Sequence, residues 1–322
     1  ERIVLLGKTG SGKSNLANTI FGEKLFTTNH TPNSGTSECQ AETRCVNERS
    51  ITLIDTPGFF DAGRSEEEMK PKILRCITEC APGPHAFLIV LKVEKFTEHE
   101  QAVITKICQY FTEDALKYAV IVFTHGDQLP KGMKIEDFVS QNENLSDLMK
   151  KCGGRCHIMD NKYWKNKQQN SYRSNLVQVD ELLNTIDKMV VENKGCYTNR
   201  VLQEVEKEIQ REEEIIKQSS GNLPPQEIRN QAKTKVSEKF LIQLAGTGTG
   251  ALLGAFFGVA VMKLVTTAAA GGVEVAGLAA GVMASFAVAG GAMGGVIGYE
   301  AAEEAKSPSE AVEIAWGLLK LI

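Results

Sequence analysis

The sequence has no excess of positive charge: 36 Lys and Arg residues stand against 40 Asp and Glu residues, a formal net charge of −4. Proteins that bind nucleic acid carry clustered basic charge, so this balance argues against a nucleic-acid partner. A disulfide framework is also lacking, because the eight cysteines are scattered and no signal peptide precedes them. We therefore expect reduced thiols and a cytoplasmic protein.

A metal site built from cysteine and histidine is equally poorly supported. Cys152, Cys156 and His157 are close in sequence, but no second pair of ligands lies nearby. Structural zinc takes four such ligands, so we do not expect zinc. Cys76 and Cys80 lie four residues apart, which is the spacing of one helix face, and we interpret them as core residues.

Apolar runs are short in the first 195 residues. They lie at residues 3–6, 51–54, 87–93, 119–123 and 155–159, and helical patterns separate them. Apolar strands that alternate with helices predict a mostly parallel sheet covered by helices on both faces. We therefore predict an α/β fold that begins with the first of these runs and is followed by an all-α C-terminal extension.

A glycine-rich loop follows the first predicted strand and precedes a predicted helix at residues 13–21. It fits the pattern G-x-x-x-x-G-K-[ST], in which backbone N–H groups surround phosphates while the lysine and the hydroxyl reach the terminal phosphates and Mg2+. We therefore predict a triphosphate site with Mg2+. The residues predicted to contact the nucleotide here are Gly7, Lys8, Thr9, Gly10, Ser11, Gly12, Lys13, Ser14 and Asn15.

The segment Asp-Thr-Pro-Gly at residues 55–58 ends the second clear strand. Asp55 is placed to reach Mg2+, and the N–H of Gly58 can sense the terminal phosphate. A threonine from the polar loop at residues 27–39 is needed to complete the metal shell; we choose Thr36, with Thr31 as the alternative. The predicted metal ligands are thus Ser14, Thr36 and Asp55.

A third segment concerns the base. Residues 124–127 read Thr-His-Gly-Asp directly after a strand, where GTP-binding proteins carry Asn/Thr-Lys-x-Asp. Asp127 is placed to accept hydrogen bonds from guanine N1 and N2. His125 stands where the lysine usually packs over the base, and an imidazole can stack there instead. The predicted nucleotide is therefore GTP or GDP.

Together these segments resemble the AIG1-type, or GIMAP, GTPases, which are septin-like relatives of the translocon GTPases. The resemblance rests on residues 7–14, 55–61, 83–91, 96–98 and 124–127, of which the block at 83–98 is peculiar to that family. It covers about residues 1–200. It implies a GTP-binding domain that dimerises across its nucleotide face, with Asn161 beside the base.

Hydrolysis requires a positioned water and neutralised charge. Phe59 and Phe60 stand where Ras-like enzymes carry a water-orienting glutamine, so we expect slow turnover. Some relatives supply an arginine in trans, and the matching residue here is Lys95, which has the charge without the bidentate fork. His85 and Glu98 are further candidates across a dimer, although His85 is equally well explained as a turn residue. The predicted catalytic residues are Lys13, Thr36, Lys95 and His85.

The C-terminal third has a different composition. Residues 240–262 and 275–299, of 23 and 25 residues, contain no charged side chain, and about 20 apolar residues suffice to cross a bilayer. Glycines recur there every four residues, which lets helices approach closely. We expect a membrane hairpin; the alternative is a buried or self-associating hairpin.

The predicted organisation is a GTP-binding domain at 1–196, a charged helical arm at 197–239, the hydrophobic hairpin at 240–305 and a short amphipathic helix at 306–322. We expect a slow GTPase that assembles with itself on the cytosolic face of an organelle membrane or lipid droplet. Two alternatives remain open. One is a nucleotide-regulated membrane scaffold without significant hydrolysis, and the other is a membrane-permeabilising effector gated by the GTPase domain.

Overall fold

The computed structural model describes residues 1–28, 38–60, 65–94, 98–164, 172–219, 223–244 and 247–258. The contacts within the chain define two units. One unit comprises Glu1–Gly63 with Gly83–Tyr197, and the other comprises Arg64–Pro82 with Thr198–Ile322. The second unit therefore joins a helix from early in the chain to the C-terminal helices.

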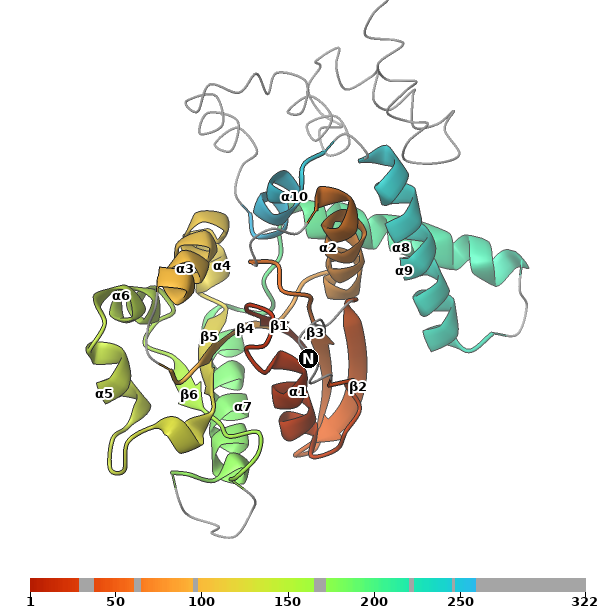
Figure 1. The fold of residues 1–322 in the computed structure, drawn as a ribbon. Helices are drawn as coiled ribbons and strands as arrows, with labels where there is room; N and C mark the ends of the chain where they lie inside the picture. Colours follow the sequence, from red (N-terminus) through yellow and green to blue (C-terminus); the bar gives the residue numbers. More distant parts are fainter. Residues whose placement is uncertain are drawn as a thin grey trace, which may run out of the picture. The chain divides into compact units, whose positions relative to one another are not determined.

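The first unit is built on a six-stranded sheet with the order β2-β3-β1-β4-β5-β6. Only β2, at one edge, runs antiparallel to its neighbour, and every other pairing is parallel. This confirms the predicted mostly parallel α/β fold (Figure 1). The strands are β1 (Arg2–Leu6), β2 (Gln40–Val46), β3 (Arg49–Asp55), β4 (Ala86–Lys92), β5 (Ala119–Thr124) and β6 (Cys156–Ile158).

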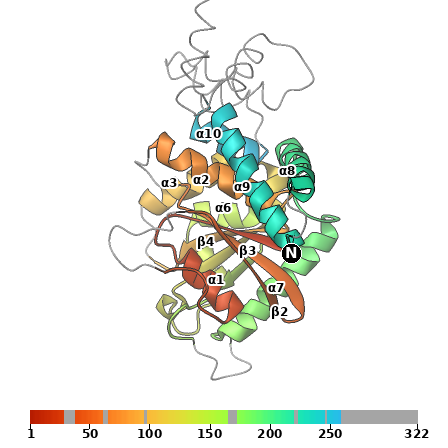
Figure 2. The same cartoon turned by 90° about the vertical axis from the view of Figure 1, so that its right-hand side faces the viewer.

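The central strands are buried on both faces, which explains why they read as continuous apolar runs. Alternate residues of a strand point to opposite faces. One set, which includes Leu5, Leu88 and Val122, packs with α1 (Lys13–Phe21) and α7 (Asn175–Glu192) in one hydrophobic core. Figure 2 shows these two helices and the sheet from the side.

The other set of strand residues faces a second group of helices. Phe87 contacts Phe111 edge-on, with ring centroids 5.4 Å apart, and Phe123 contacts Phe138 in the same way at 6.1 Å. Helices therefore cover both faces of the sheet. This group comprises α3 (Glu98–Tyr110), α4 (Glu113–Leu116), α5 (Ile135–Ser140) and α6 (Glu143–Lys151).

Parallel pairing brings the carboxyl ends of β1, β3, β4, β5 and β6 to one edge of the sheet. The predicted glycine-rich loop, the Asp55 segment and the base-reading segment all follow these ends. Segments more than 100 residues apart in sequence thus meet at one edge, where the loops of an open α/β sheet form its ligand site.

The second unit is helical. Its helices are α2 (Glu66–Cys80), α8 (Arg200–Ser219), α9 (Pro225–Gln243) and α10 (Thr249–Phe256). Arg229 on α9 forms ion pairs with Glu206 and Glu213 on α8, at 2.7 and 2.9 Å. Lys233 pairs with Glu79 on α2 at 2.7 Å, and both side chains are nearly buried. Ion pairs thus connect α9 to both α8 and α2.

The first uncharged segment, residues 240–262, does not form one continuous helix in the structure. α9 ends at Gln243 and α10 is a separate helix of eight residues, after which Gly258 adopts a left-handed φ of 84°. Phe256 and Phe257 are fully buried. No helix among the described residues is long and apolar enough to cross a bilayer; residues 259–322, with the second uncharged segment and the predicted amphipathic helix, lie outside them.

Asn199 joins two helix ends in this unit. Its Oδ1 accepts the Leu202 N–H at 3.0 Å and so caps the start of α8. Its Nδ2 donates to the carbonyls of Ala255 and Phe256, at 3.1 and 2.9 Å, at the end of α10. One side chain therefore satisfies backbone groups that the two helices cannot satisfy themselves.

We expect Asn199→Ala to lower the free energy of unfolding by about 3 kcal/mol, since the lost N-cap and each of the two lost hydrogen bonds to α10 cost roughly 1 kcal/mol. The control is Asn142→Ala, because Asn142 only caps α6, by accepting the Leu145 N–H. Urea unfolding followed by circular dichroism measures both variants. Equal losses in the two variants would show that the bonds to α10 contribute nothing.

Candidate nucleotide site

The loop between β1 and α1 depends on glycine at two positions. A Cβ on Gly7 would lie 2.5 Å from the carbonyl oxygen of Val90, so no side chain fits there. Gly12 has a φ of 92°, in the left-handed region that favours glycine, and it is the N-cap of α1. The loop therefore closes tightly onto the start of a helix, where N–H groups and the helix dipole favour phosphate.

Lys13, Ser14 and Asp55 meet at this helix start. Lys13 is 4% exposed, and its ammonium donates to the carbonyls of Gly7 and Lys8 at 3.1 and 3.0 Å. The Ser14 hydroxyl donates to Oδ2 of the fully buried Asp55. Two residues 41 positions apart in sequence are thus in contact, and their role as metal ligands stays a prediction.

The oxygen atoms of Ser14 and Asp55 suit Mg2+, which takes few protein oxygens and keeps water and phosphate ligands. Among the described residues, no group of three or more His, Cys, Asp or Glu side chains is placed to hold a metal ion. Thr36, with its alternative Thr31, lies outside the described residues. The chemistry present therefore fits Mg2+ held mainly by the nucleotide and water.

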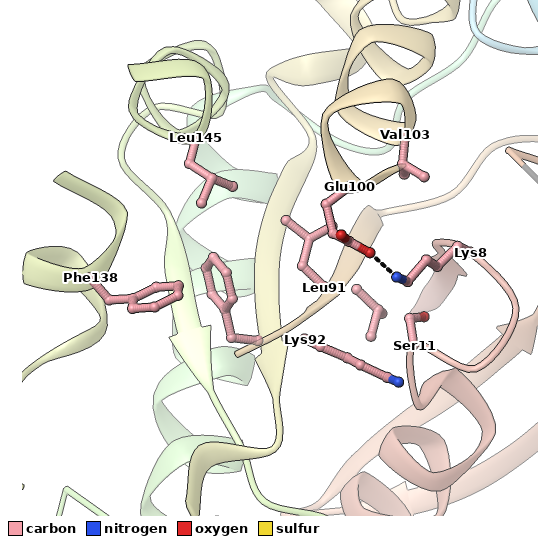
Figure 3. Close-up of a pocket in the computed structure, with 10 residues that line it drawn as sticks. Lys8, Ser11, Leu91, Lys92, Glu100, Val103, Phe138 and Leu145 are labelled. Atoms are coloured by element: carbon pink, nitrogen blue, oxygen red, sulfur yellow. Dashed lines mark hydrogen bonds and ion pairs between the residues drawn. The ribbon is translucent and has the colours of Figure 1, made fainter. Parts of the chain in front are cut away.

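The side chain of Lys8 lies between two carboxylates. Its ammonium forms an ion pair with Glu94 at 3.2 Å. A second, closer ion pair joins it to Glu100 on α3 (Figure 3). Burial opposes the charge, but hydrogen bonds with Glu100 and Glu94 raise the pKa of Lys8 above its usual value. The sequence predicts Lys8 as a nucleotide contact; the structure adds that its side chain ties the loop to β4 and α3.

A small apolar pocket lies beside this ion pair. Lys8, Ser11 and Lys92 form its polar side, and helices α3, α5 and α6 close it with apolar side chains (Figure 3). Ser11 is fully buried in the loop. Glu100 and the lining residues on α3, α5 and α6 carry no motif in the sequence, so sequence reasoning did not single out the contact between Lys8 and Glu100.

The base-reading segment is anchored by Thr124. Its hydroxyl donates to the Ser11 carbonyl at 2.8 Å, which joins the end of β5 to the phosphate loop. His125 takes a left-handed conformation with φ of 60°, and its Nδ1 lies 3.0 Å from the Thr124 hydroxyl. Asp127 follows in a short 3-10 helix, Gly126–Gln128, with its side chain exposed. The carboxylate is thus accessible to a base.

Asn161 lies at the same edge, in the loop after β6. Its Nδ2 donates to the Gly12 carbonyl at 3.4 Å, and its Oδ1 accepts the Thr19 hydroxyl at 3.0 Å. The structure therefore brings Asn161 to the phosphate loop and α1. Its predicted contact with the base stays a prediction.

Trp164 is a site residue that the sequence did not mark. A Cβ on Gly126 would lie 2.7 Å from the indole, so Trp164 packs directly against the base-reading backbone. The guanidinium of Arg173 lies over the indole ring, 6.0 Å from its centroid. The available signal was composition, since the chain has only two tryptophans.

Apolar side chains follow the metal-directed aspartate. Phe59 and Phe60 are 7% and 2% exposed, and Lys106 donates to the Phe60 carbonyl at 3.0 Å. Gly58 is also buried, and the Thr56 hydroxyl donates to the Leu5 carbonyl at 2.7 Å. Within this segment, the buried rings offer no group that could orient a water.

The structure places His85, one of the predicted catalytic residues, away from the phosphate loop of its own chain, and its role across a dimer stays a prediction. This residue precedes β4, at the edge of the sheet opposite the phosphate loop, and its Nδ1 accepts the Arg2 N–H at 3.0 Å. Burial, helped by the positive charges of Arg2 and the N-terminus, lowers the pKa of His85 to about 4. A neutral histidine at the amino edge caps the start of two strands and does not reach phosphate. Lys95 and the side chain of Glu98 lie outside the described residues.

This arrangement of phosphate loop, metal-directed aspartate and base-reading aspartate on a mostly parallel sheet defines the P-loop GTPase class. The AIG1 family model matches residues 1–218, and the chain belongs to that family as a GTP-binding domain with further helices after it.

Two relatives illustrate the match. GTPase IMAP family member 8 of Homo sapiens is 33% identical over 196 residues, which cover 61% of this chain and 28% of that protein. Immune-associated nucleotide-binding protein 8 of Arabidopsis thaliana is 34% identical over 219 residues, 66% of this chain and 60% of that protein. The chain thus spans less than two thirds of the length of either relative.

Among solved structures, Toc33 from Arabidopsis thaliana in complex with Mg2+ and GMPPNP aligns with a TM-score of 0.47 and 20% identity, over 62% of this chain and 87% of that one.

We expect Gly7→Ala to weaken GDP binding at least tenfold, or by ~1.4 kcal/mol, because the loop must move away from Val90. Isothermal titration measures the affinity. Gly22→Ala is the matched control: Gly22 also has a left-handed φ, of 71°, but nothing lies within 4 Å of its Cβ position. An unchanged GDP affinity in Gly7→Ala would contradict the close-approach argument.

Proposed function

We propose that the chain is a nucleotide switch that binds GTP with Mg2+, hydrolyses it slowly and associates with itself across the nucleotide face. The observation that carries the slow turnover is the burial of Phe59 and Phe60 directly after the Asp55 segment. Neither ring can orient the attacking water, which is the task of the glutamine in faster enzymes.

The other residues of the site have separate proposed roles. Lys13 would neutralise charge that develops on the transferred phosphoryl group. Ser14 and Asp55 would hold Mg2+, which would supply further positive charge there. Asp127 selects guanine by accepting hydrogen bonds from its N1 and N2. The chain therefore binds the triphosphate strongly but supplies little that acts on the water.

A second copy is the proposed source of the missing stimulation. Lys95 follows β4 directly after Glu94, and Glu94 pairs with Lys8 in the phosphate loop. A lysine brings positive charge without the bidentate geometry of arginine. We therefore expect self-association to raise the rate only modestly.

Single-turnover GTP hydrolysis at increasing protein concentration tests this. We expect a rate per molecule that is slow when the protein is dilute and rises severalfold as copies associate, and no turnover in Lys13→Ala, because the terminal phosphate loses its counter-charge. Sedimentation with a non-hydrolysable analogue measures association in the same samples. A rate that stays flat near zero while copies associate would favour the scaffold without hydrolysis.

Membrane attachment is a further part of the proposal. It rests on the 25 uncharged residues at 275–299, which are long enough to cross a bilayer. We expect the full chain, but not a chain ending at residue 258, to sediment with liposomes, and more strongly with GTP than with GDP. Dye leakage from the same liposomes tests the permeabilising alternative, which equal leakage from the two chains would exclude.

A further inference from the structure

Asp160, in the loop after β6, is a buried carboxylate beside the base-reading segment. It is 2% exposed. Its Oδ2 accepts the Asp127 N–H at 3.1 Å, across a sequence separation of 33 residues. Its Oδ1 accepts the Lys162 N–H at 2.8 Å and, at closer range, the Tyr163 N–H. One carboxylate therefore holds the backbones of two loops that face the base.

The main chain of Asp160 is fixed as firmly as its side chain. Asn175, the first residue of α7, accepts the Asp160 N–H at 3.1 Å and donates to the Asp160 carbonyl at 2.6 Å. Since α7 is packed into the hydrophobic core under the sheet, the position of Asp160 is set by the rigid part of the fold. Because the Asp160 carboxylate accepts the Asp127 N–H, the backbone at Asp127 is held in place as well.

The two carboxyl groups lie close enough to change each other's ionisation. Burial opposes ionisation of Asp160, but hydrogen bonds with the Asp127 side chain and with the N–H groups of Tyr163, Lys162 and Asp127 lower its pKa overall. The hydrogen bond with Asp160, desolvation and the negative charge of Asp160 raise the pKa of Asp127, although His125 opposes this. Asp160 accepts the Asp127 backbone N–H, so it fixes the main chain from which the Asp127 side chain extends.

The next residue, Asn161, contacts the part of the site that is predicted to bind the phosphates. Asn161 contacts Gly12 in the phosphate loop and Thr19 on α1, whereas Asp160 contacts the base-reading segment. Two consecutive side chains thus fix the distance between the part of the site that binds phosphate and the part that binds the base.

We propose that Asp160 is a positioning residue for guanine recognition, which holds Asp127 in the orientation that accepts hydrogen bonds from the base. The proposal rests on the proposed function, in which Asp127 reads guanine. Asp160 itself does not touch the base. Its removal therefore affects the base-dependent part of the affinity and spares the part that the phosphates contribute.

The experiment compares binding of GDP and inosine diphosphate by isothermal titration. Inosine lacks the 2-amino group, one of the two guanine donors that Asp127 accepts. In Asp160→Ala we expect about a tenfold loss of GDP affinity, ~1.4 kcal/mol, and a smaller loss for inosine diphosphate. The preference for GDP then falls at least threefold. An equal loss for both nucleotides, or no loss, would overturn the proposal and leave Asp160 a structural tie.

Three further variants sharpen the result. Asp127→Ala combined with Asp160→Ala should lose little more than Asp127→Ala alone, because residues that act through one another are not additive; additive losses would contradict the positioning role. Asp160→Asn keeps one acceptor and should show a smaller loss of GDP preference if the alanine variant does not fold. Asp137→Ala is the matched control, since Asp137 also accepts a backbone N–H, from Lys134, at an exposed helix start.

Asp127→Asn separates this proposal from the proposed function. An asparagine there should move the preference from GDP to xanthosine diphosphate, because xanthine presents an acceptor at the position where guanine presents its amino group. If that exchange fails, Asp127 does not read the base, and the proposed function fails first. If the exchange succeeds while Asp160→Ala keeps its full preference for GDP, only the positioning role is wrong.

Discussion

The parallel pairing of β1 between β3 and β4 is the constraint on which the site depends. It places Gly7 against Val90 so closely that only a glycine fits, and it sets Asp55 beside Ser14. Every other contact of the site is added to this frame. The hydrophobic core that α1 and α7 form with the sheet keeps the frame rigid, so the loops can be short and still be accurately placed.

Carboxylates organise the loops around this frame. Glu94 and Glu100 hold Lys8 of the phosphate loop, and Asp160 holds the base-reading segment. In both cases a side chain from a neighbouring strand end or helix fixes a loop that contains a predicted nucleotide contact. Buried or half-buried charge of this kind requires partners, and here the partners are the binding loops themselves.

Features formed by contiguous residues could be predicted from the sequence, whereas contacts between residues far apart in the sequence could not. The phosphate loop and Asp55 were found because each motif is contiguous and follows a strand. The contacts of Lys8 with Glu100 and of Asp127 with Asp160 span 92 and 33 residues, and no local pattern records them. His85 directly precedes β4, so in a parallel sheet it lies at the amino edge, away from the phosphate loop that follows β1. Residues 240–262 contain no charge, and this uniform composition does not reveal that α9 ends at Gln243 and α10 begins at Thr249.

Trp164 gives the site an optical property. The indole lies against the backbone of Gly126, one residue before the aspartate proposed to read the base. Indole emission responds to the polarity and mobility of its surroundings, and the chain contains only one other tryptophan. We therefore expect occupation of the base site to change the ultraviolet emission of the unmodified protein, which would allow binding to be followed in real time without a dye on the nucleotide.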